Sequence, residues 1–117
     1  MGNLIGPHEG QELELMLAGS KNLALFEQGL MPDGFSEPVE AGIFGVLKFY
    51  PLPNVGYYGL IVYVQGSLEK AERLRDLIVS SVGKGFQEHI EREIGKLLGY
   101  SDAAVDAYVE KMKNKRK

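Results

Sequence analysis

The sequence contains no cysteine and only two histidines among its 117 residues. Without cysteine the chain can form no disulfide, no thiolate metal site and no cysteine nucleophile. The absence is typical of proteins from a reducing compartment, and we expect a cytoplasmic location. Any reactive site must then be built from the histidines, carboxylates, hydroxyl groups or tyrosines, and no pattern in the sequence identifies a cofactor.

Long apolar runs are also missing. No window approaches the roughly 18 apolar residues that span a bilayer, so we expect a soluble protein without membrane contact. The first nine residues, Met-Gly-Asn-Leu-Ile-Gly-Pro-His-Glu, have no basic stretch and do not resemble a signal peptide. Hydrophobic residues make up 44% and charged residues 25% of the chain, which predicts one ordinary globular domain over residues 1–117.

Charge is unevenly placed along the chain. The net charge is -3, yet residues 111–117 carry five positive charges, so residues 1–110 hold 8 basic against 16 acidic side chains. Such an acidic body repels nucleic acid and anionic membranes and attracts a basic protein partner. We interpret the basic residues 111–117 as a frayed helix end whose charge complements the helix dipole.

The strongest structural signal is a β-hairpin between Ala41 and Gln65. Two runs rich in β-branched and aromatic residues flank the segment Pro-Leu-Pro-Asn-Val-Gly, which cannot continue a strand. Both strands are apolar on both faces, so we expect helices to cover one face of the sheet and another chain to cover the second. The glycines within the strands predict bulges or a close approach of other groups to the backbone.

Helices and one further strand surround this hairpin. Strong helix formers predict a helix over residues 7–18, a short apolar run predicts a strand over 22–27, and the prolines and glycines of 28–40 predict a long loop. Apolar residues at helical spacing predict three more helices, over 67–82, over 86–98 and after Ser101. This order predicts an α+β domain in which an antiparallel sheet of about three strands packs against C-terminal helices.

Each histidine is followed four residues later by a glutamate, giving the pairs His8–Glu12 and His89–Glu93. On a helix this spacing places both side chains on one face, and two such helices could hold a divalent metal between them. The same spacing is equally typical of surface ion pairs. The sequence therefore leaves both interpretations open for these four residues.

Aromatic residues concentrate in the hairpin, which holds Tyr50, Tyr57, Tyr58 and Tyr63. Tyrosine is enriched in protein interfaces, and we predict that these four residues and Phe35 of the long loop form an interaction surface. Nucleic-acid binding is unlikely to use it, because the hairpin interleaves its tyrosines with a single lysine, Lys48.

Two function hypotheses follow. The first is a small acidic protein-binding module, of the inhibitor or immunity type or a homodimer. The alternative is a small metal-dependent or ligand-binding enzyme that uses the histidine and glutamate pairs.

Overall fold

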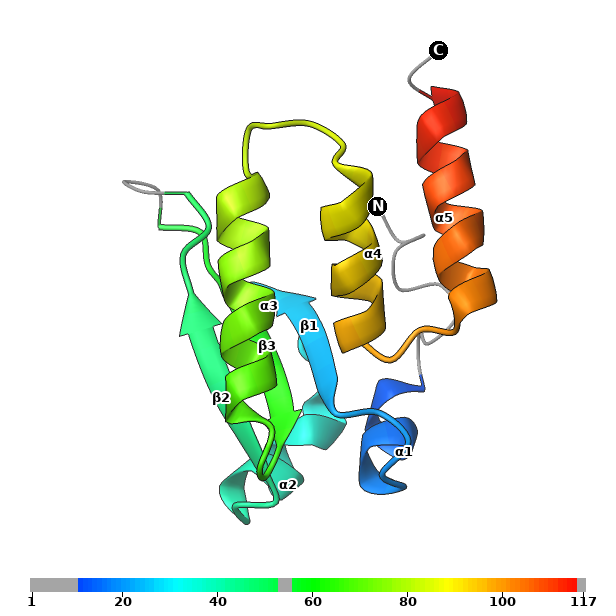
Figure 1. Cartoon of the computed structure of the whole chain (residues 1–117). Helices are drawn as coiled ribbons and strands as arrows, with labels where there is room; N and C mark the ends of the chain where they lie inside the picture. Colours follow the sequence, from blue (N-terminus) through cyan, green and yellow to red (C-terminus); the bar gives the residue numbers. More distant parts are fainter. Residues whose placement is uncertain (1–10, 53–55, 116–117) are drawn as a thin grey trace.

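The computed structural model describes residues 11–52 and 56–115 and confirms the α+β class. Its helices and strands run in the following order: α1 Glu12–Leu17, β1 Leu23–Glu27, the 3-10 helix η2 Asp33–Phe35, α2 Ser36–Glu40, β2 Phe44–Phe49, β3 Gly59–Val64, α3 Leu68–Ser81, α4 Glu88–Leu97 and α5 Asp102–Lys115. The three strands form one antiparallel sheet in the order β1-β3-β2, so the predicted hairpin supplies its central strand (Figure 1).

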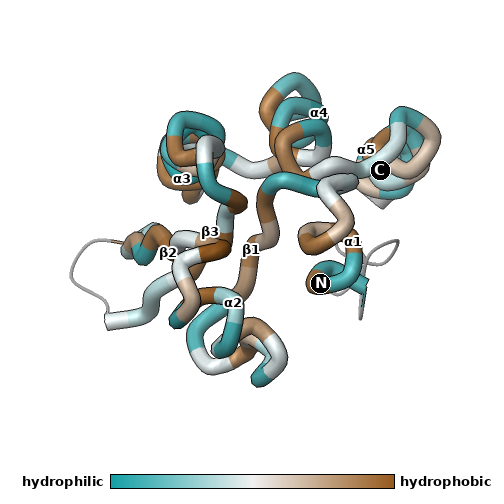
Figure 2. The backbone as a smooth tube through the Cα atoms, turned by 90° about the horizontal axis from the view of Figure 1, so that it is seen from below, coloured by the Kyte–Doolittle hydropathy of each residue, from teal (hydrophilic) through white to brown (hydrophobic). Residues whose placement is uncertain are grey.

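The sheet lies between two unequal layers of helices. Figure 2 shows α3, α4 and α5 in a row on one side of the sheet and α2 on the other. On the first side, buried side chains of the strands meet those of α3 and α4: Leu23, Phe49, Ile61, Ala71, Leu74, Leu77, Ile94 and Leu98. The second face has a smaller core of its own: Met16, Ala24, Phe26, Phe35, Phe44 and Val62. Much of the face for which we expected another chain is thus covered by α1, η2 and α2.

The segment 28–40 was predicted as a loop but contains η2 and α2. Phe35 explains the difference, because its side chain is only 1% exposed and its burial holds the segment against the sheet. Pro38 does not prevent the helix, since it is the third residue of α2 and lies within the first turn, where the backbone donors have no intrahelical acceptor.

The C-terminal helices follow the prediction with two adjustments. Helix α3 ends at Ser81, one residue before the predicted end, because the backbone of Val82 is already extended. The basic segment predicted as frayed is helical as far as Lys115, and Lys113 lies 2.9 Å from a carboxylate oxygen of Glu88. The side chain of Ser101 caps α5 as predicted, accepting a hydrogen bond from the amide of Ala104 at 3.1 Å.

Two glycines of the sheet lie beneath aromatic rings. The ring of Tyr63 covers Gly45, so closely that a Cβ at Gly45 would come within 2.3 Å of it. Phe49 covers Gly59 in the same way, with a closest approach of 2.9 Å to such a Cβ. The strand register is continuous, so these glycines mark the close approach of side chains and not bulges.

Candidate functional site

The second face of the sheet is left open at the end nearest the hairpin loop. There the side chains of Lys48, Tyr50 and Tyr58 form what we call the tyrosine surface. Tyr50 is 51% exposed, and Tyr58 is half-buried. Large apolar groups with this exposure, gathered in one place, are characteristic of an interaction site.

Aromatic and cationic contacts order this surface. The rings of Tyr50 and Tyr58 meet edge to face, with centroids 6.1 Å apart and an interplanar angle of 66°. The ammonium of Lys48 lies 4.2 Å from the centroid of Tyr58 and 5.7 Å from that of Tyr50. These contacts restrict three side chains before any partner arrives, which reduces the entropy lost on binding.

The strand register accounts for the arrangement. Lys48 is paired with Leu60 across the two strands, so Tyr50 and Tyr58, two residues further along, extend the same face. The amide of Tyr58 donates a hydrogen bond to Oε1 of Gln28 at 3.3 Å, which ties this end of β3 to the residue after β1. Tyr57 does not join these residues: desolvation and the neighbouring carboxylate of Glu27, which shares the opposite face of the sheet with Leu25, raise the pKa of Tyr57.

The other two residues of the predicted interface lie elsewhere. Phe35 is in the core, where its ring centroid lies 5.2 Å from that of Phe26 and 6.0 Å from that of Phe44. Tyr63 is half-buried on the opposite face of the sheet, over Gly45. Neither residue joins Tyr50 and Tyr58, because Phe35 supplies the apolar cover for the second face and Tyr63 points towards α3 and α4.

The histidine and glutamate pairs do not assemble into a metal centre within residues 11–52 and 56–115, which contain no group of three or more potential metal ligands. His89 and Glu93 lie one turn apart on α4, but both oxygens of Glu93 bind Arg73 of α3, at 2.7 and 2.9 Å. This hydrogen bonding lowers the pKa of Glu93. Glu12 is only 7% exposed. His8 lies outside the described residues, so a site that includes it stays a prediction.

A buried cation not singled out from the sequence is Lys21, which is 3% exposed. Its Nζ donates to the carbonyl of Leu98 at the end of α4 and lies 5.1 Å from the ring centroid of Tyr100. Burial lowers its pKa from 10.5 to about 8, and the negative charge of Glu12 partly opposes that shift. Its position links the start of β1 to the helical layer.

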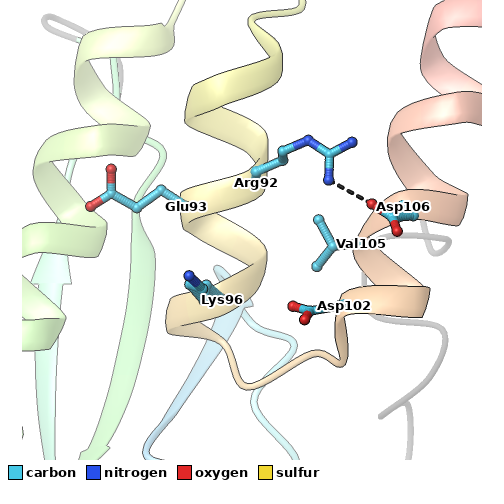
Figure 3. Close-up of a pocket in the computed structure, with 6 residues that line it drawn as sticks. All are labelled: Arg92, Glu93, Lys96, Asp102, Val105 and Asp106. Carbon is cyan, nitrogen blue, oxygen red and sulfur yellow. Dashed lines mark hydrogen bonds and ion pairs between the residues drawn. The ribbon is translucent and has the colours of Figure 1, made fainter.

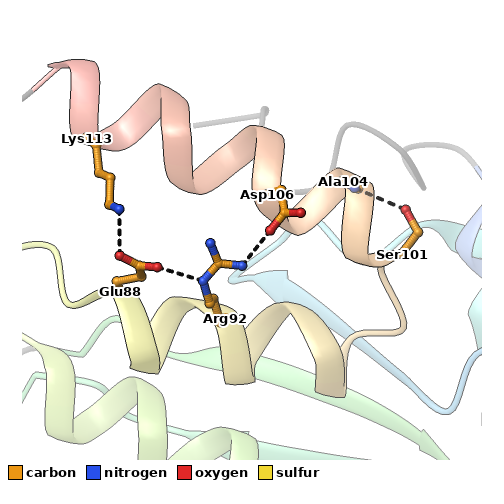
Figure 4. Close-up of polar contacts among 6 residues, drawn as sticks. All are labelled: Glu88, Arg92, Ser101, Ala104, Asp106 and Lys113. Atoms are coloured by element: carbon orange, nitrogen blue, oxygen red, sulfur yellow. Dashed lines mark hydrogen bonds and ion pairs between the residues drawn. The ribbon is translucent and has the colours of Figure 1, made fainter.

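A groove of about 470 Å³ lies between α4 and α5 (Figure 3). Arg92 points across it and donates to Asp106 at 2.7 Å, while Glu93 points away towards α3. Arg92 also binds Glu88 at 2.9 Å, and Lys113 binds the other oxygen of Glu88, as Figure 4 shows. These charged groups are paired with one another, and the pairs Arg92–Asp106 and Glu88–Lys113 hold α4 and α5 together across the groove.

Sequence reasoning found two of the three residues of the tyrosine surface, Tyr50 and Tyr58, and missed Lys48 as a member. Lys48 could have been found, since it is two residues from Tyr50 and thus on the same face of a strand. Lys21 carried no comparable signal, because an isolated lysine between a glycine turn and a strand is usually exposed.

Comparisons with protein-family models, with curated proteins and with solved structures found no match. No helix within the described ranges has the length and apolar character needed to cross a membrane.

Proposed function

We propose that this protein is a small protein-binding module and that the tyrosine surface is its binding site. The observation that carries the proposal is the ordered cluster of exposed aromatic side chains around Lys48. Tyrosine buries a large area while losing few rotamers, and its hydroxyl can bond to a partner at the rim of an interface. A lysine held over two rings adds a directed positive charge.

The charge distribution supports the same function. Residues 1–110 hold 16 acidic and 8 basic side chains, whereas the charge within the tyrosine surface is the positive charge of Lys48. Alternation of charge sign across an interface improves specificity, because a wrongly placed partner meets like charges. A partner for this site carries carboxylates opposite Lys48 and apolar groups opposite Tyr50 and Tyr58.

Site-specific photocrosslinking tests the proposal. A photoreactive phenylalanine analogue at position 50, within the tyrosine surface, should yield one defined protein adduct on irradiation in the source cells. The same analogue at position 17 is the control, because Leu17 is 55% exposed on α1, a helix that lies by the opposite end of the sheet from the C-terminal end of β2 (Figure 1). Equal yields from the two positions, or no adduct from position 50, would refute the proposal.

A pair of variants then measures the contribution of individual rings. Tyr58→Ala removes the ring that contacts both Lys48 and Tyr50, and it should weaken the identified complex by about tenfold or more. Tyr58→Phe keeps the ring and removes only the hydroxyl, so a much smaller loss is expected. Equal losses for the two variants would show that the ring contacts do not determine binding.

A further inference from the structure

The outer edge of β2 is free of any described element. Figures 1 and 2 both show β2 at the margin of the sheet, with no other helix or strand beyond it. The strand contains no proline, no bulge and only one charged residue, Lys48. Prolines, bulges and several charged residues normally protect an edge strand from pairing with another chain. Because β2 has little of this protection, its edge is suited to pairing with another strand.

The register identifies which backbone groups of β2 point outward. The amide of Val64 donates to the carbonyl of Asn22, so alternate residues of β3, counted from Val64, bond towards β1. The intervening residues Gly59, Ile61 and Tyr63 bond towards β2, where their partners are Phe49, Leu47 and Gly45. The remaining residues of β2, Phe44, Val46 and Lys48, therefore direct their N–H and C=O groups away from the sheet.

We propose that a second copy of this chain pairs with that edge, β2 against β2 in antiparallel orientation, with its twofold axis at Val46. The inference rests on the proposed function, since it names the occupant of the tyrosine surface. Only a centre at Val46 matches all three outward-pointing residues: Val46 faces its own copy, and Lys48 faces the partner's Phe44. The two sheets then form one sheet of six strands.

Side chains on both faces suit this pairing. Ile43 is 51% exposed and would pack opposite the partner's Phe49, while Val46, 37% exposed, would pack opposite the partner's Val46. A centre at Lys48 would instead place two ammonium groups opposite each other, which is unfavourable. The charge of Lys48 and the outward-pointing backbone groups of β2 therefore favour the same register, the one centred at Val46.

Charge complementarity extends to the tyrosine surface. Helix α2 lies at the beginning of β2 on the same face as Lys48, and its Glu37 and Glu40 are exposed. In an antiparallel pair, the partner's α2 comes to the end of β2, next to Lys48 and Tyr50. Two carboxylates of the partner then face the lysine, twice per dimer. Long-range repulsion between the two acidic bodies is screened beyond about 8 Å at physiological ionic strength.

The absence of cysteine provides a direct test. A single cysteine introduced as Val46→Cys would face its own copy at a Cα separation of about 5.5 Å, within disulfide range. Under mild oxidation this variant should form covalent dimer rapidly, whereas Val79→Cys, an exposed control on α3, should not. Equal rates for the two variants would overturn the proposed pairing.

Sedimentation equilibrium over a concentration series supplies the second measurement. The wild type should dimerise, and Val46→Pro should weaken the dimer by about tenfold or more, because proline removes an outward N–H but no bond to β3. Val46→Thr keeps this N–H and should retain the dimer. Lys48→Glu should weaken the dimer, and addition of Glu40→Lys should restore it.

The outcomes separate this inference from the proposed function. A wild type that stays monomeric at every concentration overturns the second copy as occupant, while crosslinking of another protein at position 50 would still support the tyrosine surface. A dimer that survives Val46→Pro, without preferential disulfide formation at position 46, overturns the strand pairing. If Val46→Pro proves unfolded by circular dichroism, the disulfide rates decide the question.

Discussion

Replacement of Lys21 by methionine should change how the stability of the protein depends on pH. The ammonium is buried, and its pKa falls from 10.5 to about 8 on folding. The folded chain therefore holds fewer protons than the unfolded chain between pH 8 and 10.5, and the free energy of unfolding rises with pH through that window. Below pH 8 the full cost of the buried charge is present, and above 10.5 that cost is gone.

The magnitude follows from the size of the shift. At about 1.4 kcal/mol per pKa unit, the whole displacement corresponds to about 3 kcal/mol, of which about 2.5 kcal/mol is recovered between pH 7 and pH 10. Above pH 10 the trend should reverse, because burial raises the pKa of Tyr100 and the folded chain then keeps a proton that the unfolded chain loses. Stability should therefore be greatest near pH 10.

Urea denaturation followed by far-UV circular dichroism at pH 7, 8, 9 and 10 measures this effect. The chain has no tryptophan, and tyrosine fluorescence changes with ionisation, so a backbone signal is the appropriate probe. Lys21→Met should flatten the rise, while Lys70→Met, which removes an exposed lysine, should keep it. Lys21→Met combined with Glu12→Gln controls for the buried carboxylate left behind. A wild type whose stability is constant from pH 7 to 10 would refute the reasoning.

Three further substitutions test the packing. Phe35→Ala should lower the free energy of unfolding by about 3–5 kcal/mol in the same urea assay, because it opens a cavity in the core of the second face. Gly45→Ala should cost about 1–3 kcal/mol by displacing the ring of Tyr63, whereas Gly56→Ala, at a position with open space around it, should cost much less. Arg92→Met removes the ion pair with Asp106 that joins α4 to α5, so amide hydrogen exchange should accelerate in α5 and stay unchanged in α3. Acceleration in both helices would show that α5 does not open separately.

Most of the fold could be predicted from local patterns. The hairpin was marked by the change from β-branched runs to a proline-rich turn, and helices α3 to α5 were marked by apolar residues at helical spacing. The segment around Phe35 could not be assigned in this way. Its prolines and glycines indicate a loop. The segment forms helical turns because the side chain of Phe35 packs against a sheet face whose residues come from strands distant in the sequence.

In the candidate site, too, contacts within the hairpin could be predicted from the sequence, whereas contacts between distant elements could not. Tyr50 and Tyr58 were found because neighbours in a hairpin stay neighbours in space. Phe35 was placed wrongly on the surface because its burial depends on Phe26 and Phe44, which come from two different strands. The pairing of Glu93 with Arg73 likewise joins two helices. Sequence spacing describes one element at a time and contains no information on such contacts.

The strand order also has a consequence for the sequence of events in folding. The nearest residues of β2 and β3, Phe49 and Gly59, are ten positions apart, whereas the nearest pair of β1 and β3, Glu27 and Gly59, is 32 positions apart. Closing the longer loop costs about 1 kcal/mol more in chain entropy. The hairpin should therefore form first and offer β3 as the template for β1. Until β1 docks, a newly made chain thus exposes the backbone groups of β3 that later pair with β1, in addition to the outer edge of β2.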